Sequence, residues 1–139
     1  MKVFERSSTE GWGNRMNFVD NNNVVVGFDY SSQCCEQYYW YASYEEAIKA
    51  TDIRVKDEWD EGHQSVSTLP NIHMDSEFLY FDTSYNKSFV AGDLNSVQLK
   101  IKGGEKDIYL VLVNSHNGYY SHGFDLVDDK GNVILEGNL

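Results

Sequence analysis

The sequence predicts one mainly β domain spanning residues 1–139, either an antiparallel sandwich or a rolled antiparallel sheet, with one short α-helix. Three observations predict this class. Segments with strand periodicity recur along the chain, turn-forming residues separate them, and only one segment resembles the start of a helix. A length of 139 residues fits one domain rather than two.

Residues 1–82 contain four candidate strands. The first two are expected at 16–20 and 24–30, on either side of three asparagines at 21–23. Asparagine tolerates left-handed backbone angles, so this triplet favours a turn. The aromatic segment 38–42 is expected to form a short strand, and 78–82 another.

The C-terminal half has clearer strand signals. Residues 97–102 alternate apolar and polar side chains, which is the period of a half-buried strand. Residues 108–115 are apolar on both faces, so a central strand is expected there. A turn is expected at 129–132, followed by a last strand at 133–136.

The dipeptide Asn117-Gly118 is a strong signal for a two-residue hairpin turn, so 120–127 is expected to pair with the strand at 108–115. Directly opposed residues share a face of a hairpin, and successive residues alternate. This register sends His116 and His122 to opposite faces unless a bulge intervenes.

The two histidines then have different roles. His122 lies among apolar residues and is interpreted as a core histidine with one hydrogen-bond partner. His116 belongs to a polar cluster at the hairpin tip that faces either solvent or a ligand, together with Asn114, Tyr119 and Ser121.

The one predicted helix begins at Ser43, because Ser43 and Glu46 have the spacing of a capping box. Apolar residues at 44, 47 and 48 then share one helical face, which predicts a helix over 43–50. Residues 51–60 fit either a helix or a strand, and 61–76 have the composition of a loop.

The chain is strongly acidic, with 11 basic and 22 acidic residues, a net charge of −11 and a pI near 4.6. This charge argues against direct binding to nucleic-acid phosphates. It is also uneven, because residues 45–82 hold ten acids and three bases.

No apolar run approaches the roughly 20 residues that span a bilayer, so no membrane segment is expected. The N-terminal residues lack the pattern of a secretory leader. The only two cysteines are adjacent and have no distant partner, which fits a reducing compartment. A cytoplasmic protein of a bacterium or phage is therefore expected.

The Cys34-Cys35-Glu36 block follows an expected strand and allows three interpretations. The thiols are metal ligands, one of them is a nucleophile, or both are small buried residues in a tight turn. The adjacent spacing suits a metal poorly, and a nucleophilic thiol needs a histidine within reach. The buried interpretation is therefore preferred.

A dense acidic cluster surrounds one tryptophan, and it comprises Asp57, Glu58, Trp59, Asp60 and Glu61. The simpler interpretation is a solvated surface. The more specific one is a docking face for a basic protein, because like charge steers an opposite patch and an exposed tryptophan supplies an apolar anchor.

Two segments resemble a known group of proteins. "NFVDNNNVVVGFDYSSQCCEQYYWYAS" (17–43) and "IYLVLVNSHNGYYSHGFDL" (108–126) are similar to a family of small uncharacterised bacterial and phage domains, with a G-[FY]-D…C-C-E block and an N-x-H-N-G-Y-Y-x-H-G-F block. The resemblance implies a shared domain with no established activity, substrate or cofactor. It also implies one structural signature, formed by Cys34, Cys35, Glu36, His116, Asn117, Gly118, Tyr119, Tyr120, His122 and Gly123.

The leading hypothesis is a small protein-binding module of the accessory or inhibitor type found in phages and mobile elements, with its acidic segment facing a basic partner. No catalytic residue, metal ligand set or cofactor is predicted, because none of the common nucleotide, hydrolase, zinc or calcium motifs occurs. One alternative is a small enzyme or metal-binding protein that uses residues 34–36 and His116. A weaker alternative is small-molecule binding in an aromatic pocket around Tyr38, Tyr39, Trp40, Tyr119 and Tyr120.

Overall fold

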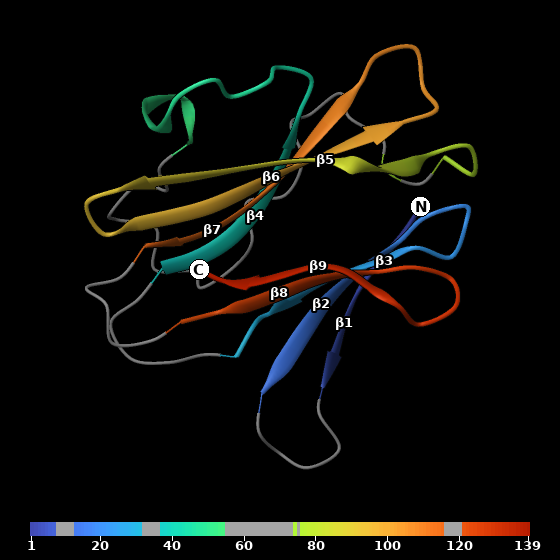
Figure 1. The fold of residues 1–139 in the computed structure, drawn as a ribbon, viewed down its shortest axis with the longest axis horizontal. Helices are drawn as coiled ribbons and strands as arrows, with labels where there is room; N and C mark the ends of the chain where they lie inside the picture. The colour runs from blue at the N-terminus through green and yellow to red at the C-terminus, as the bar shows by residue number, and fades with distance from the viewer. Residues whose placement is uncertain (8–12, 32–36, 55–73, 75, 116–120) are drawn as a thin grey trace.

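The computed structural model describes residues 1–7, 13–31, 37–54, 74, 76–115 and 121–139. Over these residues the chain forms a sandwich of two antiparallel sheets (Figure 1). No helix of this described part is long and apolar enough to cross a membrane.

The five-stranded sheet has the order β1-β2-β3-β8-β9. Its strands are β1 (Lys2–Ser7), β2 (Asn14–Val19), β3 (Val25–Asp29), β8 (Gly123–Val127) and β9 (Val133–Asn138). The four-stranded sheet has the order β4-β7-β6-β5. It consists of β4 (Gln37–Ser43), β5 (Tyr80–Ala91), β6 (Leu94–Lys102) and β7 (Ile108–Ser115).

The mainly β prediction is confirmed, and each expected strand matches an observed one to within a few residues, except β5, which continues to Ala91. The sequence did not predict β1, a charged and exposed edge strand. It also missed most of β5, because the pairing of β5 with β6 shifts register between Phe81 and Asn86. Such a bulge interrupts the alternation from which strands are recognised.

The predicted helix over 43–50 is wrong. Ser43 ends β4, and the only helical turn in the described residues is the 3₁₀ helix η1 (Ala50–Asp52). The side chain of Gln98 on β6 accepts from the Ala47 amide at 2.9 Å and donates to the Ala47 carbonyl at 3.1 Å. These tertiary hydrogen bonds take the backbone groups that a helix would use.

The predicted hairpin between 108–115 and 120–127 is also wrong. β7 pairs with β4 and β6 in one sheet, whereas β8 pairs with β3 and β9 in the other. Asn117 and Gly118 themselves lie outside the described residues. The strand at 108–115 is apolar on both faces and therefore gains more from two partners within a sheet than from a local ribbon.

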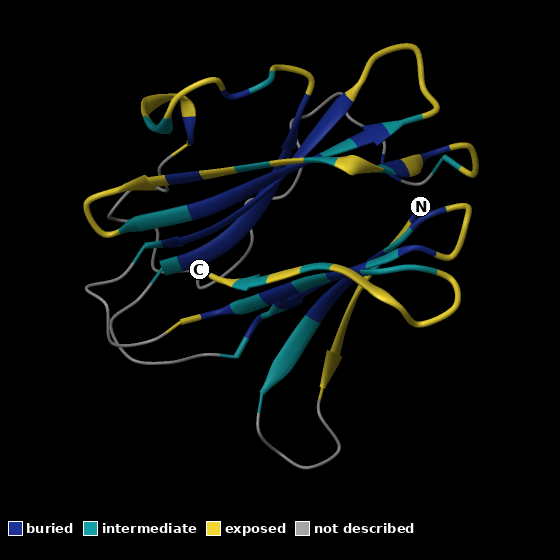
Figure 2. Cartoon of the chain, in the orientation of Figure 1, coloured by how far each residue is buried: buried dark blue, intermediate teal, exposed yellow. Residues whose placement is uncertain are grey.

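The main hydrophobic core lies between the sheets, where the central strands are buried (Figure 2). Leu110 and Leu112 of β7 face this core, while Val111 and Val113 face the other side. There residues 44–54, here called the strap, cross the outer surface of the four-stranded sheet (Figure 1). The strap covers a second, smaller apolar cluster through Ala47 and Ile53.

A buried carboxylate, Asp20, connects the two sheets. It directly follows β2, is only 5% exposed, and accepts hydrogen bonds from the amides of Asn22 at 2.8 Å and Val24 at 2.9 Å. Its other oxygen accepts from the amide of Phe81 on β5 at 2.8 Å. One side chain therefore shapes the β2–β3 turn and fixes the start of β5 against it.

We expect Asp20→Ala to lower the free energy of unfolding by about 3 kcal/mol, because three amides lose a charged acceptor and two of these bonds are buried. Chemical denaturation measures the change. The control is Asp93→Ala in the exposed β5–β6 turn, which should cost less than about 0.5 kcal/mol. A loss below about 1 kcal/mol for Asp20→Ala would contradict the connecting role.

Candidate functional site

Most of the site residues expected from the sequence lie outside the described residues. These are Cys34, Cys35, Glu36, His116 and Tyr119, together with Asp57, Glu58, Trp59, Asp60 and Glu61. Their roles as ligand-facing or partner-binding residues stay predictions.

Two candidates of the predicted polar cluster are described, and they do not share an exposed surface. Asn114 is fully buried, and its side-chain amide donates to the Leu139 carbonyl at 3.0 Å. Ser121 is exposed. Asn114 therefore supports the packing of β7 against the last described residue rather than facing solvent.

His122 is a core histidine, as predicted. It is fully buried, its Nδ1 lies 2.6 Å from the Asp29 carbonyl oxygen, and its ring stacks on Tyr38 with centroids 4.5 Å apart. It packs between the sheets, where its ring contacts those of Phe28 and Tyr38. The prediction that His116 and His122 point to opposite faces depended on the hairpin. Because the hairpin is wrong, this prediction has lost its basis.

The aromatic residues of β4 do not line one common pocket. Tyr38 and Trp40 belong to the core between the sheets, while Tyr39 belongs to the cluster under the strap. Tyr119 and Tyr120 lie outside the described residues. Within the described chain, no three His, Cys, Asp or Glu side chains are placed to hold a metal ion.

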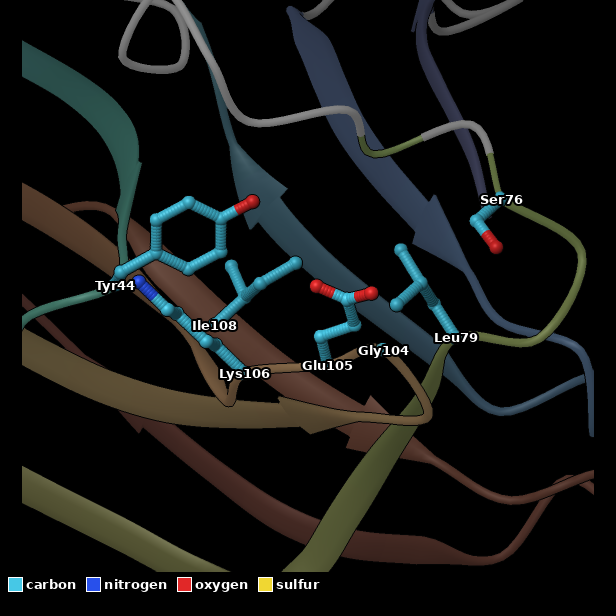
Figure 3. Close-up of a pocket in the computed structure, with 7 residues that line it drawn as sticks. All are labelled: Tyr44, Ser76, Leu79, Gly104, Glu105, Lys106 and Ile108. Atoms are coloured by element: carbon cyan, nitrogen blue, oxygen red, sulfur yellow. The ribbon is translucent and has the colours of Figure 1, made fainter.

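A different site emerges at the end of the four-stranded sheet, where a pocket of about 370 Å³ opens (Figure 3). We call it the end pocket. Its lining residues come from the strap, the segment just before β5, the β6–β7 turn and the start of β7. They are Tyr44, Ser76, Leu79, Gly104, Glu105, Lys106 and Ile108.

The end pocket combines apolar walls with charged groups. Leu79 and Ile108 are buried and form an apolar wall. Tyr44, which is 40% exposed, adds an aromatic ring. In the view of Figure 3, the Glu105 carboxylate lies between Ile108 and Leu79. Such an arrangement suits the binding of a ligand group that has an apolar body and a polar end.

Lys106 already places a cation at this site. Its ammonium lies over the Tyr44 ring, 5.5 Å from the ring centroid. No ion pair is recorded for Lys106 among the described residues, since the pairs there involve Arg15, Lys87 and Lys102. The aromatic wall therefore holds an ammonium group that pairs with no carboxylate of the described residues.

Acidic residues flank the end pocket. Glu45, Glu77 and Asp107 are exposed, and each directly adjoins a lining residue in the sequence. With Glu105, four carboxylates lie on or next to the lining segments. Two ammonium groups oppose them: that of Lys106 and the N-terminal ammonium of Met1, which donates to the Ser76 carbonyl at 2.6 Å. Phe78, which is 73% exposed, adds an apolar side chain beside Leu79. The surroundings are therefore negative and partly aromatic.

A hydrogen-bond network ties the strap to the sheet close to Tyr44. Two residues further on, Glu46 accepts from the Tyr85 hydroxyl at 2.5 Å and from Lys87 at 2.7 Å, and Gln98 donates to the same hydroxyl at 2.9 Å. The hydrogen bond from Lys87, followed by that from Tyr85, lowers the pKa of Glu46. Burial, followed by the Glu46 carboxylate, raises the pKa of Tyr85, so the phenol stays protonated and donates.

The β6–β7 turn carries Glu105 and Lys106 and depends on a glycine. Gly103 has φ of +104°, and a Cβ added there would lie 2.0 Å from the Phe78 carbonyl oxygen. Only glycine accepts both this backbone angle and this close approach. The turn therefore packs directly against the segment that carries Leu79 and Phe78.

No family model matches this chain, and no curated protein or solved structure matches it. The resemblance of segments 17–43 and 108–126 to bacterial and phage domains stays an expectation.

We expect Gly103→Ala to destabilise the fold by more than about 2 kcal/mol, because both backbone strain and a backbone clash oppose the added methyl group. The matched control is Gly131→Ala, which also has a positive φ, +84°, but has no atom within 4 Å of the added Cβ. It should cost about 1 kcal/mol. Equal losses in thermal or chemical denaturation would show that the contact with Phe78 is unimportant.

We also expect Glu46→Gln to make the free energy of unfolding less sensitive to a fall in pH. Because the folded state lowers the pKa of Glu46, its stabilisation is present above the ordinary value near 4.3 and is lost as the pH falls through the lower folded value. The variant should be less stable at neutral pH by about 1 kcal/mol, a figure that allows for partial exposure, and the difference should shrink in acid.

Denaturation at several pH values measures this difference. Glu136→Gln on β9 is the control, because Glu136 is exposed and has no ion pair among the described residues. A gap between wild type and Glu46→Gln that stays constant down to pH 2 would contradict the assignment.

Proposed function

We propose that the chain is a protein-binding module that docks a basic partner at the end pocket and the acidic surface around it. The observation that carries the proposal is an aromatic and apolar pocket with an excess of flanking carboxylates. Carboxylates steer a basic partner toward the surface, and a pocket with exposed aromatic groups anchors it after contact.

The course of the chain adds support. The acidic segment 45–82 follows Tyr44 directly and includes Ser76 and Leu79, which lie on the other side of the end pocket (Figure 3). Both ends of this segment therefore meet at the pocket. The sequence cluster of Asp57, Glu58, Trp59, Asp60 and Glu61 belongs to the stretch between them.

The proposal places the module in a reducing cytoplasm, as an accessory or inhibitor protein of a phage or mobile element. The adjacent cysteines at 34 and 35 support the reducing compartment. The net charge of −11 supports a basic protein, rather than nucleic acid, as the partner.

Charge reversal provides the test. The probe is a fluorescent peptide rich in arginine and lysine, measured by anisotropy at 0.15 M salt. We expect the triple variant Glu45→Lys, Glu77→Lys and Asp107→Lys to weaken binding at least tenfold, because it inverts the field around the end pocket.

The matched control reverses Asp93, Asp129 and Glu136, which are exposed acids that neither line the end pocket nor adjoin a lining residue in the sequence. Both triple variants change the net charge by the same amount. The control should weaken binding only by a small factor. If the two variants weaken binding equally, net charge alone attracts the peptide and the docking surface is refuted.

A further inference from the structure

We infer that the end pocket is a binding site for an arginine side chain, and that Lys106 occupies its cation position in the free protein. This inference rests on the proposed function, because the arginine belongs to the basic partner. It adds the chemical identity of the anchoring group and a competitor built into the chain. The ligand class is a guanidinium group on an aliphatic stem.

The first argument is the cation already present. The Lys106 ammonium lies 5.5 Å from the centroid of the Tyr44 ring, so this ring face accepts a positive charge in the folded protein. A contact of this kind at an exposed site is worth only about 0.5–1 kcal/mol. Lys106 is exposed and has no recorded ion pair in the described structure, so little holds it in place.

The second argument is the carboxylate on the same turn. Glu105 lines the pocket together with Tyr44, and Figure 3 shows its carboxylate within the lining group. A guanidinium group can stack flat on an aromatic ring while its N–H groups bind a carboxylate. The strongly hydrated ammonium of lysine cannot make this planar fork, so the site favours arginine over lysine.

The third argument is the apolar part of the pocket. The buried side chains of Leu79 and Ile108 offer a surface for the three methylene groups of arginine. The volume of about 370 Å³ is near the lower end of the range for ligand pockets, about 300–1,000 Å³. A single side chain, rather than a large cofactor, fits this size.

An arginine side chain that binds here therefore competes with Lys106 for one ring face. In the free protein the Lys106 ammonium covers Tyr44. When arginine enters, its guanidinium takes that face and binds Glu105, and the ammonium moves into solvent. Removing the lysine charge should strengthen binding of arginine, although the pocket loses one of its own contacts.

The experiment titrates the full chain with N-acetylarginine amide and follows backbone amide shifts by NMR. The neutral isostere N-acetylcitrulline amide and the lysine analogue serve as comparison ligands. We expect saturable shifts at Gly104, Glu105 and Lys106 with the arginine compound, weaker shifts with the lysine compound, and none with the citrulline compound.

Variants test each part of the site. Lys106→Met, which keeps the aliphatic stem, should bind the arginine compound several-fold more tightly, whereas the matched control Lys130→Met, in the exposed β8–β9 turn, should leave the affinity unchanged. Glu105→Gln should weaken binding about tenfold. Tyr44→Leu should abolish it, and Tyr44→Phe, which retains the aromatic ring, should preserve it.

Equal affinity for arginine and citrulline compounds, or no gain in Lys106→Met relative to Lys130→Met, would overturn the inference. These outcomes are separable from the failure of the docking function. If binding of the basic peptide depends on Glu45, Glu77 and Asp107 while the arginine compound does not bind, the docking surface is supported and the arginine pocket is refuted. If the arginine compound binds at the pocket but binding of the peptide does not depend on these three acidic residues, the cation site is supported and the docking function is refuted.

Discussion

The hydrogen bonds of Asp20 are the constraint on which the rest of the structure depends. A sandwich of two sheets is held mainly by apolar packing, which has little directional preference. Asp20 adds direction, because its carboxylate binds amides of the β2–β3 turn in one sheet and the Phe81 amide of β5 in the other. The Asn21 amide also donates to the Leu79 carbonyl at 3.0 Å. These bonds fix the segment from which Leu79 lines the end pocket.

The strap provides the opposite wall by a different mechanism. It lies on the outer surface of the four-stranded sheet, where the fully buried Gln98 satisfies the backbone of Ala47 on both its donor and its acceptor. Glu46 adds bonds to Tyr85 and Lys87. Side chains of β5 and β6 therefore hold the residues next to Tyr44. The end pocket thus lies between two segments that are each tied to the sheets by specific polar contacts.

This dependence on distant contacts explains which features could be predicted from the sequence. The strand at 97–102 was recognised from its alternating period and the strand at 108–115 from its continuous apolar run, because burial on one face or on both faces imposes these local patterns. The helix over 43–50 and the hairpin at Asn117-Gly118 were wrong, although both local signals are strong. In each case the decisive partners lie far along the chain: the Gln98 side chain for the first, and the strand pairing of two separate sheets for the second. The end pocket had no local signal at all, because it joins residues from three separated segments.

In the proposed docking of a basic partner, the acidic charge and the end pocket contribute through different physical terms. Attraction between exposed charges acts over about 8 Å at physiological salt and weakens as salt rises. It therefore determines mainly how fast a basic partner arrives. Stacking on Tyr44 and burial against Leu79 and Ile108 act only on contact and depend much less on salt. Because Lys106 is positive, it slightly weakens the long-range attraction, and on contact it competes directly with the partner's cation for the Tyr44 ring. The partner's cation must therefore bind this site more strongly than the Lys106 ammonium does. A guanidinium group meets that condition and an ordinary ammonium does not, so the proposed preference for basic proteins becomes a proposed preference for one side chain.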